Sequence, residues 1–500
     1  MLSTLRGWKR IQRSACFVFA LLLLLGACNE ALAQKKPRAG RKQQETQRAF
    51  PNVVIFMIDS LRADRLGAYG YTERPVSPRI DELARESVLF ENAYAPAPWT
   101  LPSVVSIMTG LFPCEHGTLD SRFVMSEHLK PIAEKLRGSQ YRTVSLYANP
   151  YSGPDYNLQR GYDVLQSVPF ANGQRVAALF DEYLREPFFL FVHNIEPHTP
   201  HTYARGPAPE GFRQISKERR LEIRDNYFAY RKLTRADFAA EQTLGTTDNT
   251  EEQQARMKTL TEMRDDYNEL YCIAVHKADE RLGEVVDELK QRGVWDNTLF
   301  ILLSDHGEEM NEHGGWLHDQ SVYEELIHVP LLIKFPRGTF GGKRISEAVS
   351  LIDVVPTLFQ YLGQAKLGRS PSGVSLMPLI REEEASPPSD FRVISMRFNT
   401  NKYFKPWKQT RGDVNIVVRH KNWKGIWNVE PDTFELYDLA ADPREQKNLS
   451  AENQALTLSM RLIAKDFWEK ARDAEIDVPK RDKTLGKQTE ESLEELGYQE

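Results

Sequence analysis

Three strand-like apolar runs in this chain of 500 residues end in side chains that bind metals or transfer protons. Asp59 follows the run at 53–58, His193 follows 188–192, and Asp305 and His306 follow 298–303. In an open α/β sheet the carboxyl ends of parallel strands meet at one edge, so these side chains are expected to gather there. Carboxylate and imidazole ligands together suit zinc, manganese or iron, with zinc and manganese favoured. The strand ends therefore predict a site for a divalent metal.

Thr100 lies in a segment whose prolines place it at the start of a helix. Residues 95–103 read Ala-Pro-Ala-Pro-Trp-Thr-Leu-Pro-Ser, and Pro102 fits the first turn of a helix that runs to about residue 108. Free N–H groups and the helix dipole favour a bound anion and a developing alkoxide there. A threonine hydroxyl is a weak nucleophile that a metal can activate. Thr100 is therefore either a nucleophile or simply a cap of the helix.

Strands and helices alternate along the chain and would position these residues. Further apolar runs occur at 143–147 and 329–333, and helical patterns occur at 77–87 and 271–292. This alternation predicts an α/β fold with a largely parallel sheet that is flanked by helices. Residues 204–265 are rich in charge and glutamine and are predicted to be an insertion of helices and loops.

The alternation of the main domain, predicted to span 50–385, changes further along the chain. Short strands are expected near 393–396 and 414–418, and a helix at 454–472. Residues 386–500 are therefore predicted to form a smaller C-terminal α+β subdomain.

Residues 1–33 are predicted to be a signal peptide, because a cationic stretch precedes an apolar run at 15–25 that is too short to span a bilayer. The segment Ala31-Leu32-Ala33 is a cleavage signal, whereas Leu25-Gly26-Ala27-Cys28 resembles a bacterial lipobox that would place a lipid on Cys28. A buried first helix is a third alternative. Residues 34–49 are typical of a flexible tether. The expected location is the bacterial periplasm, as a free protein or as a membrane-anchored lipoprotein, or outside the cell.

Charge and cysteine content narrow the range of partners. The formal net charge of −5 gives no basic face for nucleic acid, so no nucleic-acid partner is expected. Membrane contact is expected only through a lipid anchor at Cys28. A disulfide between Cys114 and Cys272 is one alternative in an oxidising compartment, and no CxxC pair indicates a structural zinc site.

Motifs spread over residues 52–449 carry a family resemblance. They are N-V-V-I-F-M-I-D at 52–59, T-L-P-S-x5-T-G at 100–110, S-D-H-G-E at 304–308, Y-E-E-x-x-H-V-P-L-L-I at 323–333, I-D-V-V-P-T-L at 352–358, G-V-S-L-M-P-L-I at 373–380 and F-E-L-Y-D-L-x-x-D-P-x-E-x-x-N-L at 434–449. In this order they resemble the sulfatase-like branch of the alkaline phosphatase superfamily. The resemblance implies a mixed, largely parallel sheet between helices, a smaller C-terminal domain, and a divalent metal beside a covalent nucleophile.

The chain departs from this family at the nucleophile. Typical sulfatases carry a cysteine, which is converted to formylglycine, in a C-x-P-S-R motif. Here Thr100 stands at the cysteine position and Val104 at the arginine position, so no formylglycine is expected. The single hydroxyl of threonine cannot expel sulfate by the hemiacetal route. Cys114 does not restore the motif, because Glu115 and His116 follow it.

The metal ligands also depart from the typical family pattern. The paired aspartates of typical sulfatases are Asp59 and Ser60 here, and His306 stands where many have asparagine. The set instead resembles one-metal sites of superfamily members that cleave or transfer phosphoryl groups. The resemblance implies one divalent ion, with manganese or zinc favoured and calcium or magnesium as alternatives. The implied ligands are Asp59, Thr100, Asp305 and His306.

The resemblance assigns further roles around this site. His198, in H-N-I-E-P-H, matches a family histidine and is expected to be a stabiliser or general acid; the alternative is a loop histidine bonded to backbone. His318 and Asn149 are expected to contact substrate, with a solvated loop residue as the alternative for His318. Glu196 and His313 are alternatives for a second metal.

Three functions remain open from the sequence. The favoured one is metal-dependent hydrolysis of phosphate monoesters, diesters or phosphonates through a covalent intermediate on Thr100. The second is a sulfatase that uses the threonine directly, and the third is a non-catalytic, metal-bearing binder of anionic glycans. The substrate is expected to be a small-molecule, glycan or lipid-headgroup ester. Hydrolysis is favoured over transfer onto lipid, because no apolar stretch of spanning length follows Cys28.

Overall fold

The computed structural model describes residues 50–201, 207–226, 251–383, 391–398, 414–430, 432–473, 479–481 and 485–496. The predicted signal peptide and tether lie outside the described residues, as do 202–206 and 227–250 of the predicted insertion. No helix within the described part of the chain is long and apolar enough to cross a membrane.

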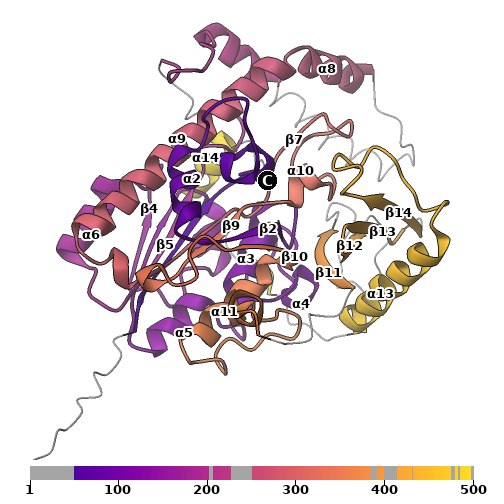
Figure 1. The fold of residues 1–500 in the computed structure, drawn as a ribbon. Coiled ribbons are helices and arrows are strands. Elements are labelled where there is room, and N and C mark those ends of the chain that lie inside the picture. The colour runs from indigo at the N-terminus through magenta and orange to yellow at the C-terminus, as the bar shows by residue number, and fades with distance from the viewer. Residues whose placement is uncertain are drawn as a thin grey trace, which may run out of the picture. The chain divides into compact units, whose positions relative to one another are not determined.

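An eight-stranded sheet forms the centre of residues 51–500, with the strand order β10-β2-β9-β6-β1-β5-β3-β4 (Figure 1). The strands are β1 (Asn52–Ile58), β2 (Val88–Tyr94), β3 (Arg142–Tyr147), β4 (Val164–Ser167), β5 (Phe188–Asn194), β6 (Thr298–Leu303), β9 (Leu331–Lys334) and β10 (Arg344–Ser350). All neighbours pair in parallel except β9, which is antiparallel to both β2 and β6. The mixed, largely parallel sheet that the sequence predicts is therefore confirmed.

One long helix, α9 (Arg264–Gln291), packs beside α2 (Pro78–Arg85) and α6 (Gly173–Glu182). This helix begins earlier than residue 271, where the sequence pattern predicts its start.

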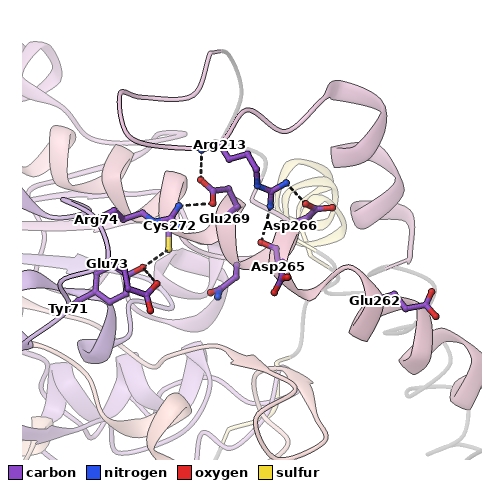
Figure 2. Close-up of a pocket in the computed structure, with 10 residues that line it drawn as sticks. Tyr71, Glu73, Arg74, Arg213, Glu262, Asp265, Asp266, Glu269 and Cys272 are labelled. Atoms are coloured by element: carbon purple, nitrogen blue, oxygen red, sulfur yellow. Dashed lines mark hydrogen bonds and ion pairs between the residues drawn. The ribbon is translucent and has the colours of Figure 1, made fainter.

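Near the start of α9 lies a cavity of about 570 Å³ with a mainly acidic lining (Figure 2). Two arginines on this wall are already paired, Arg74 with Glu269 at 2.6 Å and Arg213 with Asp266 at 2.6 Å. The pair of Arg213 ties the described part of the insertion to α9, and the pair of Arg74 ties the segment before α2 to the same helix.

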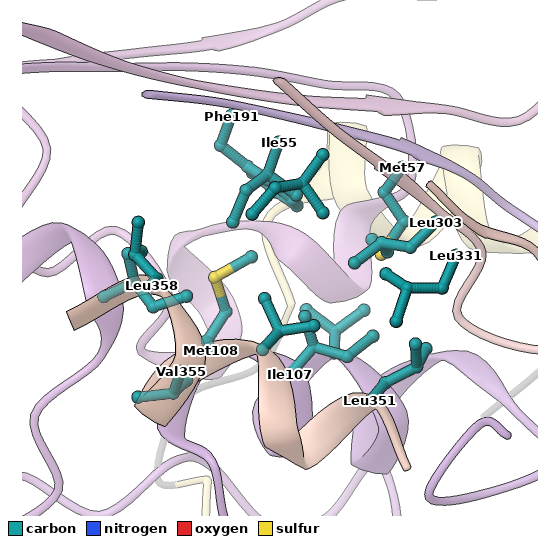
Figure 3. Packing of buried hydrophobic residues seen from close by; sticks show 14 of the residues in the cluster. Ile55, Met57, Ile107, Met108, Phe191, Leu303, Leu331, Leu351, Val355 and Leu358 are labelled. Atoms are coloured by element: carbon teal, nitrogen blue, oxygen red, sulfur yellow. The ribbon is translucent and has the colours of Figure 1, made fainter. Parts of the chain in front are cut away.

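The two faces of the sheet are buried under different helices. Alternate residues of β1 point to opposite sides, as strand geometry requires. Val54 and Phe56 join a core cluster with residues of α2, α6 and α9. Ile55 and Met57 join the other, with residues of α3 (Thr100–Thr109), α5 (Ile132–Gly138) and α11 (Val354–Tyr361) (Figure 3). The unbroken apolar runs are thus explained by burial on both faces.

A smaller four-stranded antiparallel sheet follows in the chain, as predicted. Its strands are β11 (Arg392–Phe398), β12 (Val414–His420), β13 (Trp423–Asn428) and β14 (Thr433–Asp438), and α13 (Gln454–Asp473) packs on it. An ion pair between the partly buried Arg392 and the fully buried Asp353 joins it to the main domain. Leu493 and Leu496, which the sequence assigns to this subdomain, pack into the core of the large sheet.

Short elements complete the described chain. They are η1 (Ala63–Arg65), η2 (Gly67–Tyr69), α4 (Pro113–His116), η3 (Pro150–Ser152), η4 (Pro154–Tyr156), α8 (Glu251–Glu262), η5 (Trp295–Asn297), β7 (Glu309–Met310), β8 (Trp316–Leu317), α10 (Glu324–Ile327), η6 (Pro336–Gly338), η7 (Leu351–Asp353), α12 (Met377–Arg381) and α14 (Lys487–Glu495). Cys114 and Cys272 are free, buried thiols, so the alternative of a disulfide between them is wrong.

Candidate active site

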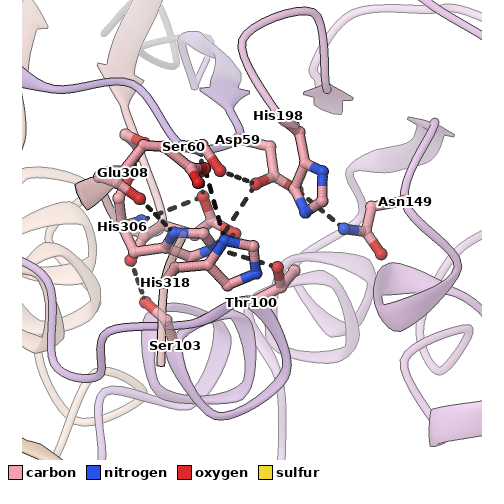
Figure 4. A network of polar contacts seen from close by, with 12 residues as sticks. Asp59, Ser60, Thr100, Ser103, Asn149, His198, His306, Glu308 and His318 are labelled. Atoms are coloured by element: carbon pink, nitrogen blue, oxygen red, sulfur yellow. Dashed lines mark hydrogen bonds and ion pairs between the residues drawn. The ribbon is translucent and has the colours of Figure 1, made fainter. Parts of the chain in front are cut away.

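The ends of three adjacent strands bring the candidate residues together. Strand β1 lies between β5 and β6, and Met57 is in register with both His193 and Leu303. The Asp59 backbone N–H donates to the carbonyl of Asn194 at 2.8 Å, which holds the two strand ends side by side. The side chains that follow these strands therefore meet at one edge of the sheet, as the sequence predicts (Figure 4).

Asp59, His193, Asp305 and His306 converge at this edge, and all four are fully buried. Asp59 Oδ2 lies 3.4 Å from His193 Nε2, and Asp59 Oδ1 lies 3.5 Å from His306 Nε2. Asp305 Oδ2 is also 3.5 Å from His306 Nε2. Ligand atoms of Asp59, His193 and Asp305 all lie within 4.8 Å of one another, which makes this group a candidate metal site.

Hydrogen bonds from the surrounding residues orient both carboxylates. Asn149 Nδ2 donates to Asp59 Oδ2 at 2.8 Å, and Ser60 Oγ donates to Asp59 Oδ1 at 2.9 Å. Asp305 Oδ1 accepts the backbone N–H groups of Ser60 and His306, at 3.3 and 3.0 Å. Asp305 Oδ2 is buried without a hydrogen-bond partner. A buried carboxylate oxygen without a donor is costly, so this atom is well placed to face a cation.

The two carboxylates differ in acidity. Burial raises the pKa of Asp59, but the histidines around it, with His198 foremost, outweigh burial and hold that pKa below its ordinary value. Burial, followed by the charge of Asp59, raises the pKa of Asp305 well above its ordinary value. Two close, buried carboxylates resist ionising together, and a cation between them would remove that repulsion.

Thr100 lies directly against this group. It is the first residue of α3, with Trp99 in extended backbone at the cap position. Its Oγ1 is 3.1 Å from His306 Nε2. The Nδ1 of His306 donates to the Gly307 carbonyl at 2.8 Å, so Nε2 carries the lone pair that faces Thr100 and the carboxylates. The Thr100 hydroxyl is therefore placed for activation, and the helix start predicted from Pro102 is confirmed.

Two further histidines, His198 and His318, lie beside this group. His318 packs between His306 and His198, with ring centroids 4.6 and 5.0 Å apart. The Nδ1 of His198 donates to the Thr199 carbonyl at 2.5 Å, and His318 Nδ1 lies 3.4 Å from Glu308 Oε2. His318 is buried, so the alternative of a solvated loop residue is wrong. Asn149 is also brought to the site, where its amide holds Asp59.

His193 is one of the strand-end residues that the sequence places at the predicted metal site, but the family resemblance does not include it among the implied ligands. Its position directly after an apolar run was a signal, but nothing in the sequence shows which way a side chain turns at a strand end. The two alternatives for a second metal lie apart. Among the described residues His313 clusters with Glu309 and Glu325, not with Glu196. Burial lowers the pKa of His313, but its 2.6 Å contact with Glu325 raises it to about 9, which indicates an ion pair.

Comparisons with known proteins identify the family of this chain. Residues 51–364 match the family model for sulfatase, and residues 311–472 match that for the C-terminal part of N-sulphoglucosamine sulphohydrolase. The N-acetylglucosamine-6-O-sulfatase of Bacteroides thetaiotaomicron is 23% identical over 490 residues, which cover 82% of this chain and 84% of that protein.

Solved structures share the fold. The phosphonate monoester hydrolase of Agrobacterium radiobacter has a TM-score of 0.60 at 20% identity, covering 84% of this chain and 95% of that one. A putative sulfatase from Bacteroides thetaiotaomicron has a TM-score of 0.63 at 20% identity, covering 85% and 95%. Proteins described as hydrolases of two different esters thus have this architecture.

Proposed function

This chain belongs to the sulfatase family and is an ester-bond hydrolase, and from that premise we propose that it cleaves phosphate monoesters, diesters or phosphonates through a covalent intermediate on Thr100. The observation that carries the proposal is the Thr100 hydroxyl, 3.1 Å from His306 Nε2 and next to two buried carboxylates. The proposed substrate is a small-molecule, glycan or lipid-headgroup ester.

Proteins of this superfamily bind a divalent metal, and the structure offers a site for one. The residues fit such an ion, because Asp305 Oδ2 and His193 Nε2 are buried without hydrogen-bond partners. We propose one ion, with Asp59, Thr100, Asp305 and His306 as ligands. Zinc or manganese suits mixed carboxylate and imidazole donors, whereas calcium and magnesium prefer oxygen alone. When bound, the ion lowers the pKa of the hydroxyl and neutralises charge on the transferred group.

Thr100 and His198 have different roles in the proposed reaction. Deprotonated Thr100 Oγ1 attacks phosphorus, a bond forms to that oxygen, and the bond from phosphorus to the ester oxygen breaks. His198 gives a proton to the departing oxygen, because its Nδ1 is already bonded to backbone and its Nε2 is the remaining donor. His198, now neutral, then takes a proton from a water molecule, whose oxygen bonds to phosphorus while the bond from phosphorus to Thr100 Oγ1 breaks, and the deprotonated threonine is regenerated.

A phosphoryl group is favoured over sulfuryl because of the nucleophile. The intermediate on Thr100 can be released only when water attacks its phosphorus or sulfur atom. A threonine has a single hydroxyl, so it cannot expel sulfate by the hemiacetal route. Sulfate-ester hydrolysis remains the second candidate, favoured by the family match and by the named sulfatase relative. A purely binding role is set aside, because the chain is an ester-bond hydrolase.

A substrate panel tests the choice between the two esters. The purified protein is supplied with zinc or manganese and assayed with nitrophenyl sulfate, nitrophenyl phosphate and bis-nitrophenyl phosphate. We expect kcat/KM for one of the phosphate esters to exceed that for the sulfate by about 100-fold or more. A larger kcat/KM for the sulfate would instead establish a sulfatase in which threonine suffices.

Replacing His198 by glutamine tests its role as a general acid. We expect kcat to fall by about 10²- to 10³-fold for a phenyl or alkyl ester, whose leaving oxygen needs a proton. The loss should be much smaller for a nitrophenyl ester, which departs as a stable anion. The measurement is the ratio of the two losses.

The matched control is His201→Gln. His201 is a buried histidine of the same segment that packs against Tyr267, and burial lowers its pKa to about 3. The His201→Gln substitution should lower kcat for the phenyl or alkyl ester and for the nitrophenyl ester by the same factor. Equal losses for both esters in His198→Gln would show that this histidine positions groups and donates no proton.

A further inference from the structure

His193 is buried at the centre of the site, yet the proposed reaction gives it no role. We infer that His193 is a further ligand of the same metal ion and that Ser152 positions it, an inference that rests on the metal site of the proposed function. Metal binding by His193 can be measured without turnover.

Two buried atoms without hydrogen-bond partners, and the distances between the surrounding ligand atoms, support this role. His193 Nε2 and Asp305 Oδ2 are both fully buried without a hydrogen-bond partner. Two ligand atoms that lie about 2.1 Å from one ion at a tetrahedral angle are roughly 3.4 Å apart. Asp59 and His193 are separated by 3.4 Å, and His306 lies 3.5 Å from an oxygen of both Asp59 and Asp305. These separations are those of ligands around a common ion.

The second nitrogen of the His193 ring is held as metal-binding histidines require. His193 Nδ1 lies 2.6 Å from Ser152 Oγ, at the end of η3. When Nδ1 carries the proton and donates it to the serine oxygen, Nε2 presents its lone pair to the carboxylates. Such a partner fixes the tautomer and the ring orientation of a ligand.

An ordinary ion pair between His193 and Asp59 explains the contact less well. It would require a proton on Nε2 directed at Asp59 Oδ2, yet at 3.4 Å the two atoms form no hydrogen bond. That oxygen already accepts from Asn149 Nδ2 at 2.8 Å. A cation between the groups would use the histidine lone pair and the carboxylate charge together.

With His193 as a ligand, the protein would retain different ions than without it. With His193 included, the donors comprise two imidazoles and two carboxylates besides the threonine. Imidazole nitrogen favours zinc over magnesium and calcium, which bind oxygen donors. The inference therefore predicts a selectivity for zinc that depends on His193.

The experiment measures zinc affinity of the full protein by competition with a chromogenic chelator. We expect His193→Ala to weaken zinc binding by about 100-fold or more, and Ser152→Ala by about 10-fold, as for a lost partner of a ligand. His193→Asp should lower the ratio of zinc to magnesium affinity by about 10-fold or more. The control His201→Gln should bind zinc as the unmodified protein does.

The outcomes separate this inference from the proposed function. If Asp305→Asn loses zinc while His193→Ala and Ser152→Ala both keep it, the metal site stands and the role of His193 is wrong. If the unmodified protein itself binds no zinc or manganese, the metal of the proposed function is wrong. Circular dichroism of the metal-free variants reports folding, and should His193→Ala not fold, Ser152→Ala and the selectivity of His193→Asp decide the matter.

Discussion

Replacing Thr100 by alanine is expected to lower kcat/KM by about 10⁵-fold toward every ester that the protein cleaves, which corresponds to about 7 kcal/mol of transition-state stabilisation. The substitution removes the oxygen that forms the covalent bond, and the remaining residues can only position a water molecule. The rate is measured under saturating metal. Mass spectrometry of quenched reactions should find one phosphoryl group on the peptide that contains Thr100, and none in the variant.

Two controls distinguish chemistry from folding. Thr100→Ser keeps the hydroxyl and should retain activity within about 100-fold of the original. Thr100→Ala should change the free energy of unfolding by no more than about 1 kcal/mol, the scale of a lost helix-end contact. An alanine variant that keeps substantial turnover would show that no intermediate forms on this residue, and water would then be the nucleophile.

Metal removal is the second change with a large expected effect. Dialysis against a strong chelator should reduce kcat/KM by about 10³-fold or more, because the hydroxyl and the transferred group both lose their counter-charge. Zinc or manganese should restore the rate more fully than calcium. Asp305→Asn should give the same loss and should not be rescued by added metal, since it removes one of the two charges that hold the ion.

A buried aspartate elsewhere provides the matched control. Asp279, on α9, accepts the backbone N–H groups of Arg79 and Ile80, and burial raises its pKa to about 7. Asparagine keeps one of the two acceptor oxygens, so the variant has some cost in stability, but the substitution changes no residue of the candidate site. Asp279→Asn should keep both the activity and its dependence on metal. Full activity after exhaustive removal of metal would contradict the assignment of the site.

The apolar runs of the sequence predict most of what positions the site. Because β1, β5 and β6 are buried on both faces, their runs are unbroken, and the residue after each run falls at the catalytic edge. Pro102 marks the start of α3 in the same way and places Thr100 there. Local patterns therefore predict where Thr100, Asp59, Asp305 and His306 lie, whereas their proposed roles as nucleophile and ligands come from the family resemblance.

Other features depend on contacts that no local pattern records. The run at 329–333 predicts a strand, but a run of buried residues has no direction, and β9 is antiparallel to its neighbours. His193 obtains its orientation from Ser152, which arrives from the end of a different strand. Asn149 reaches Asp59 in the same way. These pairings depend on the order of strands in the sheet, which only the tertiary structure shows.

The distribution of the site along the chain has a consequence for folding kinetics. Ser60 and Asp305, which are bonded to each other, are separated by 245 positions, and Asn149 and Asp59 by 90. Contacts of such long range form late, because their loop-closure entropy must be overcome first. In small zinc modules the ion drives folding from nearby ligands. Here an ion would find its ligands assembled only after β6, β1 and β5 have paired, so metal capture would be the final event of maturation.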